Sequence, residues 1–142
     1  MDLSLSWQGI VLGTLAYMVV GFVWYTKGVF GGAWMKSLGW TQKDIKKGDQ
    51  GKSMILMLIA SLVTVYVLQH VIAVFTEGMY GVIPGMQGGF WCWLGFVLTS
   101  NGTNAVFERR VNVGFWINVG FQLVALVVAG GIIGYLGEQM FF

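Results

Sequence analysis

Four long stretches of the chain contain no charged residue, and apolar side chains dominate each of them. They are residues 3–26, 53–76, 78–107 and 111–137. Each is longer than the ~20 residues that a helix needs to cross the ~30 Å hydrocarbon core of a bilayer. None shows the alternation of apolar and polar residues, over ~10-residue segments, that a spanning barrel strand requires. The pattern therefore predicts an all-α integral membrane bundle of four transmembrane helices.

The predicted spans are shorter than the uncharged runs, because the ends of a run include turn residues. In a single membrane domain of residues 1–142, the spans cover about 5–26, 53–76, 88–108 and 113–136, and a loop of residues 27–52 separates the first two. The connection 76–89 holds the only proline and five glycines, which predicts a turn.

The loop 27–52 is predicted to contain short helical structure. Its opening is rich in aromatic residues and interrupted by glycines, which is typical of a segment lying in the membrane interface. Thr41 followed by Asp44 predicts a capping box at the start of a short helix, and Gly48 is positioned to end it.

Composition agrees with a membrane protein and excludes most soluble classes. Charged residues make up 10% of the chain and apolar residues 56%, and the mean hydropathy is +0.73, outside the usual range for a soluble domain. The single Cys92 cannot form an intramolecular disulfide, and no Cys/His cluster suggests a metal. No cofactor and no nucleic-acid partner is expected.

Basic residues are confined to two of the segments between the spans. Six lysines fall within residues 27–52 and two arginines at 109 and 110, whereas both termini and the connection 76–89 have neither. Because basic loops stay in the cytoplasm, both termini are predicted to face outward. Glu108, Arg109 and Arg110 then form the cytoplasmic tip of the hairpin between the third and fourth spans.

Amide side chains interrupt the last two spans at matching depths. Counted inward from the hairpin tip at ~1.5 Å per residue, Asn104 falls near Asn118 and Asn101 near Gln122. Amides inside hydrocarbon are unfavourable unless they find hydrogen-bond partners, so we expect them to pair across the hairpin. The candidate polar intramembrane layer comprises Tyr17, Ser61, Asn101, Asn104, Asn118 and Gln122.

His70 and Glu77 form a candidate polar pair near the outer face. They are separated by seven residues, so both are expected on the same helix face. A histidine inside a membrane is a candidate proton carrier. At headgroup depth it instead hydrogen-bonds to water or to Glu77, and its late position in the span favours this second interpretation.

Several short stretches, taken in order, resemble a known family. These are Gly21 to Tyr25, Phe30-Gly31, Trp34-Met35, Trp93 to Phe96, Phe107 to Arg109, and Trp116 to Asn118 with Gly120. They are similar to a family of small bacterial four-span membrane proteins known only as domain of unknown function 1761. The resemblance covers nearly the whole chain and implies an integral protein of the bacterial inner membrane. It implies no activity, cofactor or catalytic residue.

The chain is also similar in size to the small four-helix drug exporters, which work as dimers. Those proteins rely on a membrane-buried carboxylate in their first span. Residues 3–26 contain no acidic residue, which argues against proton-coupled export of cations by that mechanism.

Three functions are weighed from the sequence. An intramembrane enzyme is disfavoured, because the spans contain no HExxH motif and no buried Ser/His or Asp pair at a workable spacing. We expect instead a non-enzymatic bundle that self-associates or docks on a partner, in which the amides join helices at ~0.6–2 kcal/mol per contact. The alternative is a small-solute transporter or permeation pathway lined by the polar layer. An aqueous cavity that reaches Asn101 and Gln122 would favour the pathway, whereas amides that close on each other would favour the bundle.

Glycine-rich helix faces predict the partner of such a bundle. Gly9, Gly13 and Gly21 recur at roughly helical spacing in the first span, and Gly130 and Gly134 form a small-xxx-small pair in the last. Such faces allow two helix backbones to approach closely. Besides the lipid bilayer, the expected partner is a second copy of the chain, in a dimer.

Overall fold

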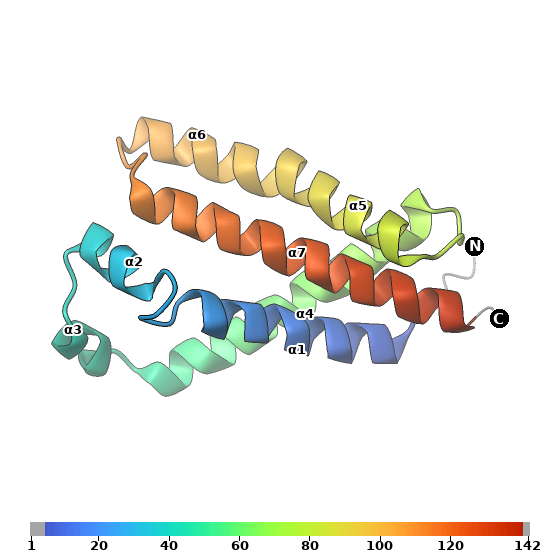
Figure 1. Cartoon of the computed structure of the whole chain (residues 1–142), viewed down its shortest axis with the longest axis horizontal. Coiled ribbons are helices and arrows are strands. Elements are labelled where there is room, and N and C mark those ends of the chain that lie inside the picture. The colour runs from blue at the N-terminus through green and yellow to red at the C-terminus, as the bar shows by residue number, and fades with distance from the viewer. Residues whose placement is uncertain (1–4, 141–142) are drawn as a thin grey trace.

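Residues 5–140 are described by the structure, a computed structural model in which every regular element of that range is a helix. In chain order they are α1 (Trp7–Trp24), α2 (Gly31–Leu38), α3 (Gln42–Lys47), α4 (Gln50–Phe75), α5 (Val82–Cys92), the π-helical η1 (Trp93–Leu98), α6 (Thr99–Phe107) and α7 (Val113–Met140). Figure 1 shows long helices that lie side by side, with α2 and α3 gathered at one end. The all-α prediction is confirmed.

In the part of the chain that the structure describes, three helices are long and apolar enough to cross a membrane: α1 with 18 residues, α4 with 26 and α7 with 28. They correspond to the first, second and fourth predicted spans. Where the third span is predicted, α5, η1 and α6 follow one another without a break. These three elements form one rod in Figure 1.

The rod starts at Val82 rather than near residue 88, so the predicted turn 76–89 is too long. Pro84 lies in the first turn of α5, where its missing N–H would have no partner within the helix. The glycines that suggested a turn instead bring α5 close to α7. The turn itself occupies residues 76–81.

Glycine permits unusually close packing between α5 and α7. A methyl group on Gly85 would collide with the carbonyl oxygen of Gly130, and one on Gly89 with that of Leu126. On the other helix, a methyl group on Gly134 would collide with the carbonyl of Gly81. The small-xxx-small face of α7 is therefore occupied within one chain.

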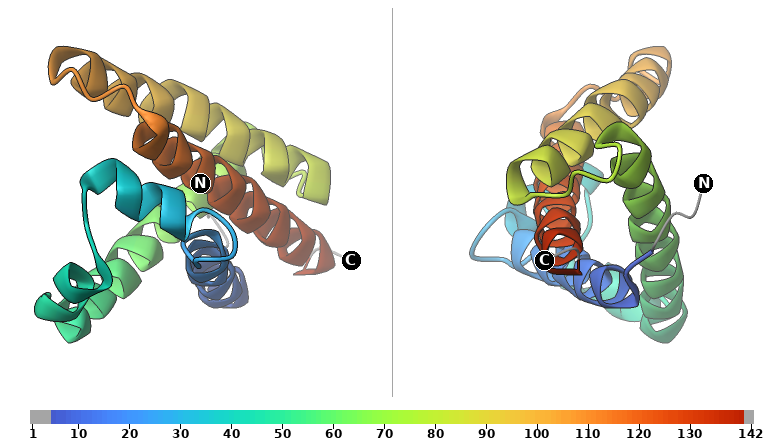
Figure 2. Two further views of the ribbon diagram at one scale, coloured as in Figure 1. Left: turned by 60° about the vertical axis from the view of Figure 1, so that its left-hand side comes forward. Right: turned by 90° about the vertical axis from the view of Figure 1, so that its right-hand side faces the viewer.

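The central helix of the bundle is α7, which contacts α1, α2, α4, α5 and η1. The view along the long axis in Figure 2 shows α1, α4 and α5 around it. A buried apolar cluster joins α4 to α7; its members are Val65, Leu68, Ile72, Leu126, Ala129 and Ile133. Glycines of α1 face inward too, since a methyl group on Gly13 would lie 2.8 Å from Val65 Cγ1.

Apolar side chains are also abundant on the outside of the helices. Phe107 is 85% exposed, Phe96 73% and Ile55 60%. In water such a surface would be costly, because each large apolar side chain loses its hydrophobic stabilisation when exposed. The outer surface therefore has the character of helices that face lipid.

The loop between α1 and α4 contains two short helices. The predicted capping box of α3 is confirmed: the Asp44 carboxylate accepts from the Thr41 N–H at 2.7 Å and from the Thr41 hydroxyl at 3.0 Å. The helix ends at Lys47, directly before Gly48. The helix α2 packs against α7, where a methyl group on Gly114 would collide with the Ser37 side chain.

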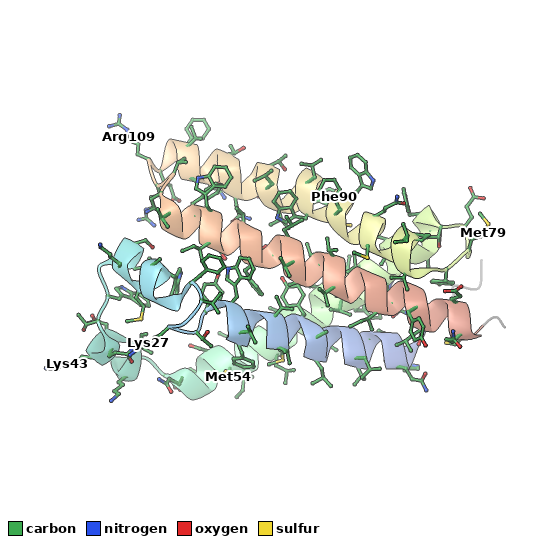
Figure 3. All side chains as sticks on the ribbon, in the orientation of Figure 1. Lys27, Lys43, Met54, Met79, Phe90 and Arg109 are labelled. Carbon is green, nitrogen blue, oxygen red and sulfur yellow. The ribbon has the colours of Figure 1, made fainter. Side chains whose placement is uncertain are left out.

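The two basic segments lie at the same end of the bundle. In Figure 3, Lys27 and Lys43 share that end with Arg109, and Met79 lies at the opposite end. The start of α1 and the end of α7 also lie at the Met79 end (Figure 1). An up-and-down arrangement of four helical rods places the charges in this way.

Candidate functional site

Hydrogen bonds from three aromatic side chains converge on one turn of α7. The Trp24 indole N–H donates to the carbonyl of Ile117 at 2.9 Å, and the Trp93 indole N–H donates to the carbonyl of Val119 at 2.8 Å. Between these two acceptors, Asn118 Oδ1 accepts from the Tyr25 hydroxyl at 3.1 Å. The end of α1 and the start of η1 are thus fixed to α7 around Asn118.

Trp24, Tyr25 and Trp93 lie near the ends of the predicted spans, where aromatic side chains are often found at the headgroups. In this structure the polar atom of each one donates a hydrogen bond to α7. Sequence offers no signal for this, because a helix carbonyl is available as an extra acceptor at every position.

An aromatic cluster extends from this turn. The Tyr25 ring lies 5.1 Å from that of Trp34 on α2 and 5.5 Å from that of Phe121 on α7, both edge to face. The Phe121 ring also lies 5.5 Å from that of Tyr17. Gly21 leaves room for it, since a methyl group there would come within 3.3 Å of Phe121 Cε2. The cluster fastens α2 to the bundle.

A cavity of about 390 Å³ opens beside Asn118 at the basic end. We call it the amide cavity, since Asn101, Asn104 and Asn118 line it. Its other lining residues are Tyr25, Trp34, Ser37, Leu38, Ala105, Glu108, Arg110, Asn112, Gly114 and Phe115. The predicted matching depth of Asn104 and Asn118 therefore brings them to one cavity.

The three lining asparagines predicted for the polar layer, Asn101, Asn104 and Asn118, do not bond to one another in the described structure. The Asn101 amide nitrogen donates to the Val97 carbonyl of its own rod at 2.8 Å, Asn118 accepts from Tyr25, and no hydrogen bond involves the Asn104 side chain. Tyr25 from α1 satisfies the acceptor that the hairpin partner was expected to use. The amides thus form a lining instead of a direct bridge between the rods.

The hairpin tip begins at the mouth of the amide cavity. Arg109 has the left-handed φ of 55°, and the N–H groups of Arg109 and Arg110 donate to the carbonyls of Val106 and Ala105, which ends α6 in a Schellman motif. Arg110 Nη1 lies 3.6 Å from Glu108 Oε2, with both side chains mostly exposed. Such a pair contributes little stability but places one charge of each sign at the mouth.

The rest of the predicted polar layer lies elsewhere. Tyr17 and Gln122 line a second cavity of about 360 Å³, which we call the inner cavity. Phe121, whose ring contacts both Tyr17 and Tyr25, lies between the two cavities. Ser61 lines neither; its buried hydroxyl donates to the Met57 carbonyl at 2.7 Å.

The candidate outer pair is not joined by a hydrogen bond or an ion pair in the described structure. His70 Nδ1 lies 2.8 Å from the Tyr66 carbonyl, and the His70 ring lies 4.5 Å from the Tyr66 ring. Glu77 is exposed and lies in the turn beyond α4, with a left-handed φ of 52°. Because α4 ends at Phe75, the helical face shared by the two positions does not reach Glu77.

Gln69, next to His70, is a buried polar residue that sequence reasoning missed. It is 1% exposed, and its amide, in the orientation that satisfies both groups, pairs with the backbone N–H and carbonyl of Ser6. It thereby fixes the start of α1 to α4. Its spacing from Val65 and Ile72, on the apolar face of α4, was the available signal.

Within residues 5–140, no three His, Cys, Asp or Glu side chains are grouped to hold a metal ion. Most polar side chains that line the two cavities carry amides or hydroxyls; the inner cavity adds the Cys92 thiol, and the amide cavity adds the charges of Glu108 and Arg110. Amides and hydroxyls bind polar ligands by hydrogen bonds.

Comparison with known proteins identifies the family. Residues 8–134 match the family model described as protein of unknown function DUF1761. No curated protein and no solved structure matches the chain. Because the family model covers most of the chain, this protein belongs to the DUF1761 family.

Proposed function

We propose that the chain crosses the membrane four times, with the rod α5–η1–α6 as the third span. The rod is continuous from residue 82 to 107, which gives ~38 Å of helix at 1.5 Å per residue, enough to cross the hydrocarbon. Its exposed residues include Phe90, Trp91 and Phe96. A rod of this kind packed along α7 suits lipid better than water.

The orientation follows from the grouping of the basic residues at one end. We place that end in the cytoplasm of a bacterial cell, with both termini on the outer side of the inner membrane. The amide cavity then opens toward the cytoplasm.

Within this topology, the protein binds a small polar solute in the amide cavity and serves as its transporter or permeation pathway. The observation that carries the proposal is that Asn101, Asn104 and Asn118 line one cavity without bonding to one another. Amides that served only to join helices would be expected to pair. Unused donors and acceptors that face a cavity are suited to a solute.

The mouth of the cavity indicates the class of solute. Glu108 and Arg110 provide one negative and one positive charge, and the amides provide both donors and acceptors. Neither sign of net charge is favoured by this set. We therefore expect a neutral or zwitterionic solute, bound without covalent chemistry.

Flux through reconstituted vesicles tests the proposal. Stopped-flow light scattering should show faster entry of at least one member of a panel of glycerol, urea, glycine and alanine than in protein-free vesicles. Asn104→Leu is the informative variant, because the Asn104 side chain is exposed and makes no hydrogen bond, so folding should not change. It should slow the entry markedly.

The matched control is Gln87→Leu, an exposed amide on α5 outside the cavity. This control should retain the wild-type rate. If no solute of the panel enters faster than in empty vesicles, or if Asn104→Leu and Gln87→Leu behave alike, the proposal fails.

Self-association is the alternative function. The packing of the glycines limits which surface could form a dimer. Gly130 and Gly134 contact α5, and Gly9 and Gly13 contact α4. A dimer would need a different surface. The first half of α4, where Ile55, Leu56 and Ile59 are exposed, offers apolar area but nothing that distinguishes a second copy from lipid.

A further inference from the structure

The inner cavity lies at membrane depth between α1, α4, η1 and α7. Gln122 follows the start of α7 at Val113 by nine residues, and Tyr17 precedes the end of α1 at Trp24 by seven. At helical rise these spacings are ~14 Å and ~10 Å. The polar atoms of the cavity therefore lie well inside the ~30 Å hydrocarbon layer.

Three polar side chains of this cavity lack hydrogen-bond partners in the described structure. No hydrogen bond involves the Tyr17 hydroxyl, the Gln122 amide or the Thr64 hydroxyl, although all three line the cavity. In hydrocarbon, where water is absent, such groups are unfavourable. They gain most if a ligand provides the missing donors and acceptors.

Thr64 departs from the behaviour of the other helical threonines. Thr14, Thr99 and Thr103 each donate to the carbonyl four residues earlier, at 2.6–2.8 Å. This local bond satisfies a hydroxyl in a membrane helix without any partner. Thr64 makes no such bond, so its hydroxyl is available to the cavity.

The mouth of the inner cavity faces lipid. Val63 and Val67 of α4 are 55% and 52% exposed, and Phe96 of η1 is 73% exposed. These side chains frame an opening between α4 and η1 that is apolar and faces sideways. A ligand that passes this opening arrives from the hydrocarbon and needs an apolar part.

The lining residues also restrict the charge and chemistry of the ligand's polar end. None of the lining residues is charged, so an ionised head would enter without a counter-charge, which is strongly disfavoured at this depth. A carbonyl or hydroxyl oxygen can accept from Tyr17 or Thr64, and the Gln122 amide can donate or accept.

We propose that the inner cavity binds a neutral lipid-soluble molecule that has a carbonyl or hydroxyl group at one end of a hydrocarbon chain. The oxygen binds to Tyr17, Thr64 and Gln122, and the chain leaves between α4 and η1 into the bilayer. A π-helical segment in the wall agrees with this, since such segments often occur at functional sites. This site is separate from the amide cavity and does not depend on its role.

Cys92 provides a direct readout, because it is the only cysteine of the chain and lines this cavity. The experiment measures how fast a membrane-permeant maleimide modifies Cys92 in the full chain in phospholipid nanodiscs. Dodecan-2-one is the probe, and dodecane is the control of equal length. The ketone should slow labelling roughly tenfold at about ten times its Kd, as a blocked site predicts, and dodecane should not.

Two variants distinguish the loss of polar contacts with the ligand from the loss of the fold. Gln122→Leu combined with Tyr17→Phe should abolish protection by the ketone while labelling without ligand continues. Gln87→Leu, on the exposed face of α5, should retain protection. Equal protection by dodecane and ketone would mean that the cavity holds hydrocarbon without using its polar atoms, and would overturn the proposal. So would persistent protection in the double variant, no protection in wild type, or a Cys92 that is not labelled.

Discussion

The Tyr25 hydroxyl donates a 3.1 Å hydrogen bond to Asn118 Oδ1 and so joins the residue after α1 to the second turn of α7. We expect a double-mutant cycle of Tyr25→Phe and Asn118→Leu to give a coupling free energy of about 0.5–1.5 kcal/mol, the net value of such a bond. Unfolding in mixed micelles measures it. Tyr135→Phe, which removes an exposed hydroxyl, is the control and should change stability little.

The two single variants show what each partner loses when the other is removed. Asn118→Leu removes the acceptor but leaves the Tyr25 hydroxyl beside the amide cavity, where water or a solute can reach it. Each single variant should therefore lower the free energy of unfolding only slightly. A coupling free energy near zero would show that the bond contributes nothing to the attachment of α1 to α7.

Much of the architecture could be predicted from the sequence, for a physical reason. A helix in hydrocarbon must be long, apolar and uncharged, so the uncharged runs mark the helices directly. The capping box at Thr41 and Asp44 is equally local and was also predictable. The position of Pro84 within α5 was missed because a proline in the first turn of a helix and one in a loop look alike in sequence.

The candidate site was only partly predictable. Matching depths brought Asn104 and Asn118 to one cavity, since rise along a helix fixes depth. Depth does not fix rotation about the helix axis, and rotation decides which partner an amide meets. Tyr25, from a different helix, meets Asn118, and Phe121 separates the Tyr17 and Gln122 cavity from the asparagines.

The capping box of α3 predicts a pH dependence in the loop between α1 and α4. Hydrogen bonds from the Thr41 backbone N–H, and secondly from its hydroxyl, hold the pKa of Asp44 below its ordinary value. A lowered folded pKa means that the stabilisation is fully present above the unfolded pKa of ~3.9 and is lost as pH falls through the folded value. The start of α3 should loosen only in that acidic range.

The Thr41 amide resonance followed by NMR against pH measures this transition. Its midpoint should lie below ~3.9, the value of an unperturbed aspartate. In Asp44→Asn, which has no titrating carboxyl group, the transition should disappear. A midpoint above that value in the wild-type protein would contradict the capping role.

The grouping of basic residues predicts that α3 and the end of α7 lie on opposite sides of the membrane. Single cysteines at Lys43 and Gln139, both exposed, should react with an impermeant maleimide from opposite sides in a Cys92→Ala background. Gln139 is a better site than Gly137, where any side chain would collide with Tyr80. Labelling of both positions from one side would refute the four-span topology.

The contact of α5 with α7 predicts which glycines cannot be enlarged. In Gly85→Ala or Gly130→Ala the new methyl group meets a backbone carbonyl of the facing helix, which cannot move aside as a side chain could. The helices must separate, and we expect each variant to lose about 1–3 kcal/mol of stability, the usual cost of overpacking. Unfolding in mixed micelles would measure the loss.

Gly102→Ala is the matched control for this contact. Gly102 is also a helical glycine, but a methyl group there meets no atom within 4 Å. Since alanine is the better helix former, this variant should gain up to about 1 kcal/mol. The opposite signs of the two effects separate close packing from helix propensity, and a Gly130→Ala protein as stable as Gly102→Ala would show that α5 and α7 do not touch along their glycines.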